Sequence, residues 1–199
     1  MFAIFSILYF YMTTGYQIKD QAGLHYLTFQ VVDWIDIFTR QVYRDIVIDS
    51  FKYAMENKGF QLFGYVIMSN HLHLIANSSI EKLSNTIGDI KKFTSKEIIK
   101  TIESIAESRR EWLLSRFRYK AKQHSRNENY QVWTHENHAI YLYSPEFIAE
   151  KLEYLHQNPV RAGIVANPED YLYSSARNYA GLDAVLEIEL LSLPVITVR

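Results

Sequence analysis

The sequence predicts an α+β domain of the ferredoxin-like type, with βαββαβ order and an antiparallel sheet that carries helices on one face. Three observations point to this fold. Strand-like and helix-like segments alternate along the chain, two adjacent apolar runs are joined by a short polar turn, and 199 residues suit one domain with a sizeable core. The second face of such a sheet is free to hold a functional site.

The first four elements follow from hydrophobic periodicity. Residues 24–32 are rich in strand formers and predict the first strand. Residues 39–58 repeat apolar side chains at helical spacing and predict a helix. Residues 60–68 and 71–76 predict two further strands, and the Ser-Asn pair between them predicts a hairpin turn.

The remaining elements complete the predicted order. Residues 83–106 predict a helix that is entered through a Ser79–Glu81 cap region. Residues 121–129 are polar and predict a loop, and residues 130–133 predict the fourth strand. A further, C-terminal helix is predicted over 145–158, because a proline occupies its first turn and apolar residues follow at helical spacing.

Two histidines, His71 and His73, flank Leu72 on the predicted third strand. Side chains at positions i and i+2 of a strand project from the same face, so both imidazoles are expected to lie together while Leu72 and Leu74 point into a core. Paired imidazoles on one rigid face can hold a divalent metal ion. A structural or merely exposed histidine pair is the alternative interpretation.

Tyr154 and Asn158 lie four residues apart on the predicted C-terminal helix and therefore share one helical face. Pro159 disfavours helical geometry at Asn158, so the amide is expected at the frayed end of the helix. Tyr154 could equally be a packing tyrosine, and Asn158 a helix C-terminal residue.

Taken together, these segments resemble the REP-associated tyrosine transposases, a branch of the single-tyrosine HUH transposases. The similarity lies in the histidine-hydrophobic-histidine strand and in the segment KLEYLHQNPVRAGIV, which resembles the tyrosine helix of that family and its following turn. It extends to VWTHENHAIYL (132–142) and PEDYLYSSARNYAG (168–181), and spans about Gly15 to Gly181.

The resemblance implies a transposase-type single-stranded DNA endonuclease and strand transferase. Tyr154 would be the nucleophile, and His71 and His73 would hold a divalent ion, Mg²⁺ or Mn²⁺. The third ligand of the family is a polar side chain on the tyrosine helix. Here the i+4 spacing favours Asn158 over Gln157, which lies about 60° away around the helix. The expected substrate is single-stranded or hairpin DNA, and two coupled cleavages would require a homodimer or sequential turnover.

Basic residues are concentrated between Lys91 and Arg126, where 11 Lys or Arg stand against four Glu, a net charge of +7 in a chain of net charge -1. Aromatic residues at positions 112, 117 and 119 interleave with these cations, a mixture that suits phosphate contact and base stacking. A solvated helix face with internal ion pairs is the alternative. The candidate DNA contacts are Lys91, Lys92, Arg116, Arg118, Lys120 and, on the tyrosine helix side, Arg161.

The predicted domain covers residues 15–183, with an apolar extension at 1–14 and a tail at 184–199. The first 11 residues are apolar but too short to span a bilayer, and we expect an upstream start codon or a packed extension instead of a membrane segment. The sequence contains no cysteine, so a thiolate metal site is excluded and a cytoplasmic location is expected.

The sequence is also compatible with two other functions. The protein could be a catalytically silent relative that binds hairpin nucleic acid without cleaving it. It could also be an unrelated metal-dependent hydrolase in which Tyr154 only packs.

Overall fold

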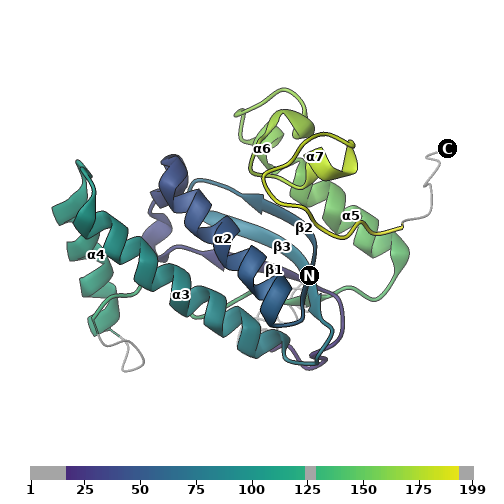
Figure 1. The fold of residues 1–199 in the computed structure, drawn as a ribbon, viewed down its shortest axis with the longest axis horizontal. Coiled ribbons are helices and arrows are strands. Elements are labelled where there is room, and N and C mark those ends of the chain that lie inside the picture. The colour runs from purple at the N-terminus through teal and green to yellow at the C-terminus, as the bar shows by residue number, and fades with distance from the viewer. Residues whose placement is uncertain (1–16, 124–128, 193–199) are drawn as a thin grey trace, which may run out of the picture.

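A computed structural model describes residues 17–123 and 129–192 of the chain. Its four antiparallel strands form one sheet in the order β2-β3-β1-β4, and Figure 1 labels β1, β2 and β3. Their bounds are β1 His25–Gln30, β2 Phe60–Ile67, β3 His71–Ser78 and β4 Ile140–Tyr141. This is the strand order of a ferredoxin-like βαββαβ unit, so the predicted fold class is confirmed.

One face of the sheet is covered by α2 (Gln41–Asn57) and α3 (Leu83–Ser104), which lie side by side in Figure 1. The main core fills the space between these helices and the sheet, and Leu72 and Leu74 are fully buried in it, as predicted. Alternation along β3 therefore sends His71 and His73 to the opposite face.

That opposite face carries α5 (Pro145–His156), which is followed by α6 (Asn158–Arg161) and α7 (Ala176–Tyr179). A second, smaller core forms where Leu152 and Leu155 of α5 meet Tyr26 and Ile75 of the sheet. Gly64 on β2 allows this close approach, because a Cβ at that position would lie 3.0 Å from the Leu152 Cδ1 atom.

The fourth strand was predicted at 130–133, and that prediction is wrong. Val132 and Trp133 are buried, which explains the strand-like pattern, but the backbone of this segment is paired by one isolated bridge between Trp133 and Val31 and forms no strand. The strand that pairs with β1 is β4, in which Tyr141 lies opposite His25 and Ile140 lies opposite Tyr26. Burial alone does not distinguish a packed loop from a paired strand.

The entry to α3 also differs from the prediction. The N-cap residue is Lys82, whose side chain forms no cap, and the Ser78 hydroxyl accepts a hydrogen bond from the Lys82 amide at 3.1 Å. The predicted Ser79–Glu81 cap is therefore replaced by Ser78, the last residue of β3.

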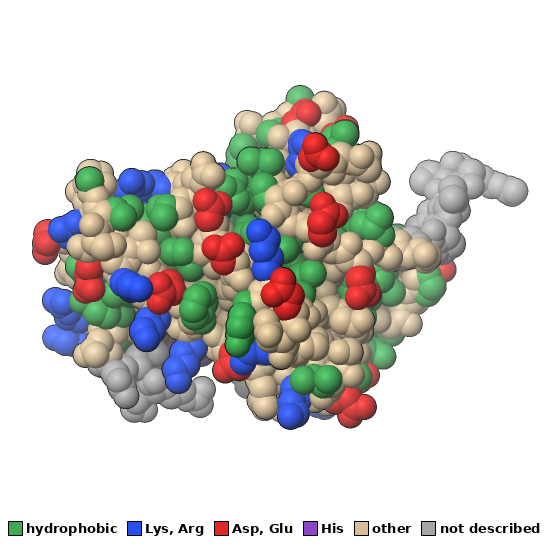
Figure 2. Space-filling model, in the orientation of Figure 1, with side chains coloured by type: hydrophobic (Ala, Val, Ile, Leu, Met, Phe, Trp, Pro, Cys, Tyr) green, Lys and Arg blue, Asp and Glu red, His purple; other side chains and the backbone are tan. Residues whose placement is uncertain are grey.

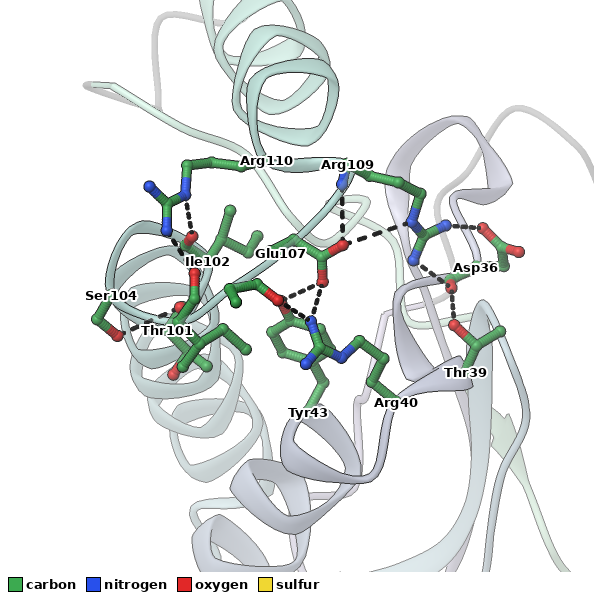
Figure 3. A network of polar contacts seen from close by, with 12 residues as sticks. Asp36, Thr39, Arg40, Tyr43, Thr101, Ile102, Ser104, Glu107, Arg109 and Arg110 are labelled. Atoms are coloured by element: carbon green, nitrogen blue, oxygen red, sulfur yellow. Dashed lines mark hydrogen bonds and ion pairs between the residues drawn. The ribbon is translucent and has the colours of Figure 1, made fainter.

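The C-terminal part of the basic segment forms a further helix, α4 (Arg110–Lys122), so the predicted loop at 121–129 begins later than expected. Glu107 lies in the turn between α3 and α4 and is only 7% exposed. Its carboxylate accepts hydrogen bonds from Arg40 and Tyr43, both at 2.9 Å, and from the Arg109 amide at 3.0 Å (Figure 3). The Glu107 cluster, which we define as these four residues, joins α2 to the α3–α4 turn.

The structure describes part of the predicted C-terminal tail and none of the predicted N-terminal extension. The predicted extension at 1–14 lies outside the described residues. The predicted tail packs on the domain in its described part, since Leu186 is buried and its carbonyl accepts a hydrogen bond from the Asn178 amide at 3.0 Å. Within residues 17–123 and 129–192, no helix has the length and apolarity needed to cross a bilayer.

Candidate active site

His71 and His73 lie side by side on β3, with their ring centroids 4.9 Å apart. Each ring is held through its Nδ1 atom. His73 Nδ1 is 2.9 Å from the Thr28 hydroxyl on the neighbouring strand, and His71 Nδ1 is 2.7 Å from the Asn70 side-chain oxygen. Such partners orient a metal-binding imidazole and leave its Nε2 atom for the ion.

The protonation state of both rings suits metal binding. Burial lowers the pKa of His71, and burial together with His71 and Arg161 lowers the pKa of His73 to about 3. Both imidazoles are therefore neutral at neutral pH, which is the form that coordinates a metal ion. The described residues contain no group of three or more His, Cys, Asp or Glu side chains that could together hold a metal ion. A divalent ion held by the two imidazoles would thus take its other ligands from amide, phosphate or water oxygens.

Tyr154 on α5 is adjacent to this pair, with its ring centroid 6.0 Å from that of His73. The helix starts where predicted, since Pro145 lies in its first turn and the Ser144 hydroxyl accepts a hydrogen bond from the Phe147 amide at 3.3 Å. Tyr154 is 44% exposed, so its side chain is accessible to a ligand.

Asn158 occupies the junction of two short helices and not a frayed end. Pro159 fits the first turn of α6, where no intrahelical N–H is needed, so the chain continues in helical geometry past the predicted end of the tyrosine helix. The Asn158 amide nitrogen donates to the Tyr154 carbonyl at 2.9 Å. Its side-chain oxygen is therefore the atom suited to a metal ligand.

Arg161 is close to the same tyrosine. Its guanidinium lies 4.1 Å from the centroid of the Tyr154 ring and donates to the Tyr154 carbonyl at 2.7 Å. His156, by contrast, is buried on the other side of α5 and lies 2.9 Å through Nε2 from the Ser175 hydroxyl. His156 therefore serves packing.

Four residues of this site were not predicted from the sequence: Tyr26, Thr28, Trp34 and Asn70. The Tyr26 ring stacks on His73, with centroids 5.2 Å apart and planes at 29°. The Trp34 ring meets His71 edge-on at 6.0 Å and is 58% exposed. Tyr26 and Thr28 lie two residues apart on β1, so they share one face of the sheet, and Thr28 pairs with His73 on β3. The register of β1 against β3 is therefore the feature that assigns both residues to the site.

The predicted DNA-contact cations have different surroundings. Arg116 and Lys120 both pair with Asp33, which directly precedes Trp34, and Arg118 donates to the Tyr130 hydroxyl at 2.8 Å. Lys92 is exposed on α3. On the α2 and α3 side of the molecule, basic side chains gather toward the α4 end (Figure 2).

Lys91 is engaged within the protein. Its ammonium group donates to the Thr134 carbonyl at 3.0 Å, to the Glu136 carbonyl at 3.1 Å and to the Asn137 side chain. Burial lowers the pKa of Lys91 to about 7. Phe117, between the basic residues of α4, is likewise part of the main core and not a stacking surface. Lys91 and Phe117 therefore stabilise the fold.

Two comparisons with known proteins found similarities to this chain. Residues 27–139 match the family model described as "Transposase IS200 like". A solved structure, described as a REP-associated tyrosine transposase bound to a REP hairpin, has a similar fold with a TM-score of 0.60 and 15% sequence identity. The similarity covers 94% of this chain and 100% of that one. No protein of curated function matches the sequence. Because the family model covers more than half of the sequence, the chain belongs to the IS200-like transposase family.

Proposed function

We propose that the protein is a metal-dependent single-stranded DNA endonuclease and strand transferase that uses Tyr154 as its nucleophile. The observation that carries this proposal is the position of Tyr154, whose ring lies 6.0 Å from that of His73 although the two residues come from different elements. Family membership supports DNA processing, and it disfavours an unrelated hydrolase in which Tyr154 only packs.

The reaction would be a phosphoryl transfer to the tyrosine. The Tyr154 phenolic oxygen forms a bond to the scissile phosphorus, and the bond from that phosphorus to the 3′-oxygen breaks. The phenolic proton is lost and the released 3′-oxygen ends as a hydroxyl, so the products are a 5′-phosphotyrosine and a free 3′-hydroxyl. A later attack by a 3′-hydroxyl on the phosphotyrosine rejoins the strands and restores Tyr154.

His71, His73 and the Asn158 side-chain oxygen would hold the divalent ion. When bound, such an ion polarises the scissile phosphate and stabilises charge on the leaving oxygen. Both Mg²⁺ and Mn²⁺ fit this role, and the two imidazoles favour Mn²⁺ in affinity. Thr28 and Asn70 would keep both imidazoles in the tautomer and orientation that the ion needs.

The substrate we propose is single-stranded DNA that carries a hairpin. The similar solved structure holds a REP hairpin, and this chain places an exposed aromatic ring, Trp34, beside His71. An exposed ring can stack on an unpaired base but not on a base inside a duplex. Asp33, the residue before Trp34, forms ion pairs with Arg116 and Lys120 of α4. These two cations are therefore candidate contacts for the phosphates of the bound DNA strand. Lys92, Arg118 and Arg161 are the other candidates.

A cleavage assay tests this proposal. The protein is incubated with end-labelled hairpin DNA that has a single-stranded flank, in Mg²⁺ or Mn²⁺, and the products are separated under denaturing conditions. We expect a shortened strand and a protein–DNA adduct, neither of which forms in excess chelator or with a fully paired duplex of the same sequence. Binding without cleavage would identify a catalytically silent hairpin-binding protein instead.

A further inference from the structure

Tyr26 carries a hydroxyl group that makes no hydrogen bond in the described structure, although it is fully buried. The residue is 4% exposed, and its phenolic oxygen has no protein partner. A buried hydroxyl without a partner costs about 1–3 kcal/mol, so phenylalanine would serve the packing of this position better. The fold therefore gives no reason for the hydroxyl group.

The surroundings of Tyr26 suggest a reason. Its ring stacks on His73 at 5.2 Å and meets the edge of the Tyr154 ring at 6.3 Å, so it lies between the proposed metal ligand and the proposed nucleophile. Burial and Tyr154 raise the pKa of Tyr26, while Arg161 lowers it. The net effect of these surroundings keeps the phenol protonated, so it can act only as a neutral donor or acceptor.

A scissile phosphate at this place would supply the missing partner. In the proposed reaction, the phosphate must lie between the histidine pair and Tyr154, and Tyr26 has contacts with both. Tyr154 borders Tyr26, and Arg161 lies over the Tyr154 ring. Both side chains are exposed, so they can shift when a phosphate attracts the Arg161 guanidinium.

We propose that Tyr26 is a further catalytic residue, whose hydroxyl donates a hydrogen bond to a non-bridging oxygen of the scissile DNA phosphate. The inference rests on the proposed function, which places that phosphate. A donor aimed at an oxygen where charge develops accelerates reaction more than it strengthens substrate binding. Tyr26 should therefore affect the rate of cleavage far more than the affinity for DNA.

Tyr65 on β2 provides a matched control. It is fully buried and its hydroxyl also has no hydrogen-bond partner in the described structure, but it belongs to the main core on the α2 side of the sheet. Substituting either tyrosine by phenylalanine removes one unpartnered buried hydroxyl. Only Tyr26 lies at the proposed site.

The experiment compares Tyr26→Phe and Tyr65→Phe with the wild type in single-turnover cleavage of hairpin DNA with Mn²⁺, together with DNA binding and thermal unfolding. We expect both variants to unfold at or above the wild-type temperature. Tyr26→Phe should cleave about 10- to 100-fold more slowly with DNA affinity within about threefold of wild type. Tyr65→Phe should cleave at the wild-type rate.

A modified substrate identifies the acceptor atom. A methylphosphonate at the scissile position replaces one non-bridging oxygen by a methyl group, and its two stereoisomers are assayed separately. For the isomer that lacks the Tyr26 acceptor, we expect Tyr26→Phe to cause no further loss of rate. Equal cleavage of the normal substrate by the wild type and Tyr26→Phe would overturn the role of Tyr26 alone. Absence of cleavage by the wild type would overturn the proposed function and this inference with it.

Discussion

Two polar clusters in this molecule contrast in how their hydrogen-bonding groups are used. In the Glu107 cluster, both carboxylate oxygens accept hydrogen bonds, from Arg40, Tyr43 and the Arg109 amide. Burial alone would raise the pKa of Glu107, but these three donors outweigh it and lower the pKa. Around His73 the bonding is incomplete, because Thr28 engages one ring nitrogen and the stacked Tyr26 hydroxyl has no partner in the described structure.

This difference separates a polar cluster that stabilises the fold from one that suits a ligand. A saturated buried cluster has no bonding capacity for anything else, and Lys91, with its three acceptors, is a second example. Unsaturated buried groups cost stability, and a ligand can complete the bonding of those that lie at a binding site. The comparison predicts that changes at the histidine pair affect catalysis, whereas changes at Glu107 affect stability.

The largest expected effect follows from removing a proposed metal ligand. His73→Ala, and equally His71→Ala, should lower the cleavage rate by about 1,000-fold or more, because the ion loses one of two imidazoles. Binding of Mn²⁺, measured by calorimetry, should weaken in parallel, while hairpin DNA affinity changes little because phosphate contacts supply most of it. Wild-type cleavage by either variant would remove the histidine pair from the mechanism.

A smaller effect is expected at Thr28, which contacts the proposed metal ligand His73 and not the ion itself. Thr28→Val removes the hydroxyl that holds His73 Nδ1 and preserves the shape of the side chain. Loss of such a partner lowers metal affinity by about 10- to 100-fold. Titration of Mn²⁺ against the cleavage rate should show a matching rise in the concentration needed for half-maximal activity, with recovery at high Mn²⁺. No shift in that concentration would mean that Thr28 serves only the pairing of β1 with β3.

At the Glu107 cluster, the expected effect is a loss of stability. Glu107→Ala leaves Arg40, Tyr43 and the Arg109 amide without their shared acceptor, and Tyr43 is fully buried. We expect the free energy of unfolding to fall by about 2–3 kcal/mol, since Arg40 is partly exposed and regains water. Denaturant unfolding measures this loss. Cleavage at a temperature where the variant is folded should equal that of the wild type, and a cleavage defect there would break the contrast between the two clusters.

An effect that is zero at neutral pH and appears only in acid is a dependence of stability on pH through His156. Burial lowers the pKa of His156 to about 4, below the value near 6.5 of an unfolded chain. Above pH 6.5 both states are neutral and the stability is complete. As the pH falls from 6.5 toward 4, the unfolded state takes up a proton that the native state does not, so up to about 3 kcal/mol is lost. His156→Gln should show a shallower loss over that range in metal-free denaturant unfolding, and an unchanged slope would contradict this assignment.

Much of this arrangement was predictable because it depends on local periodicity. The alternation in β3 predicts that His71 and His73 share a face, and helical spacing predicts that Tyr154 and Asn158 do. The short strand β4 was not predictable, because residues 130–133 are as apolar as a strand but pack without a ladder of hydrogen bonds. Tyr26 and Thr28 could not be assigned to the site, because their position depends on the register of β1 against β3. Local patterns indicate which face a residue occupies, whereas pairing between distant segments decides which residues meet.

The role of Tyr154 as the nucleophile is tested most directly by identifying the residue that becomes linked to DNA. The protein is incubated with hairpin DNA and Mn²⁺, the adduct is digested with protease and nuclease, and the modified peptide is sequenced by mass spectrometry. We expect a 5′-phosphate link on Tyr154, and no adduct from a Tyr154→Phe variant that folds and binds DNA like the wild type. A link on Tyr141 or Tyr143, which are also exposed, or an adduct that persists in Tyr154→Phe, would contradict it.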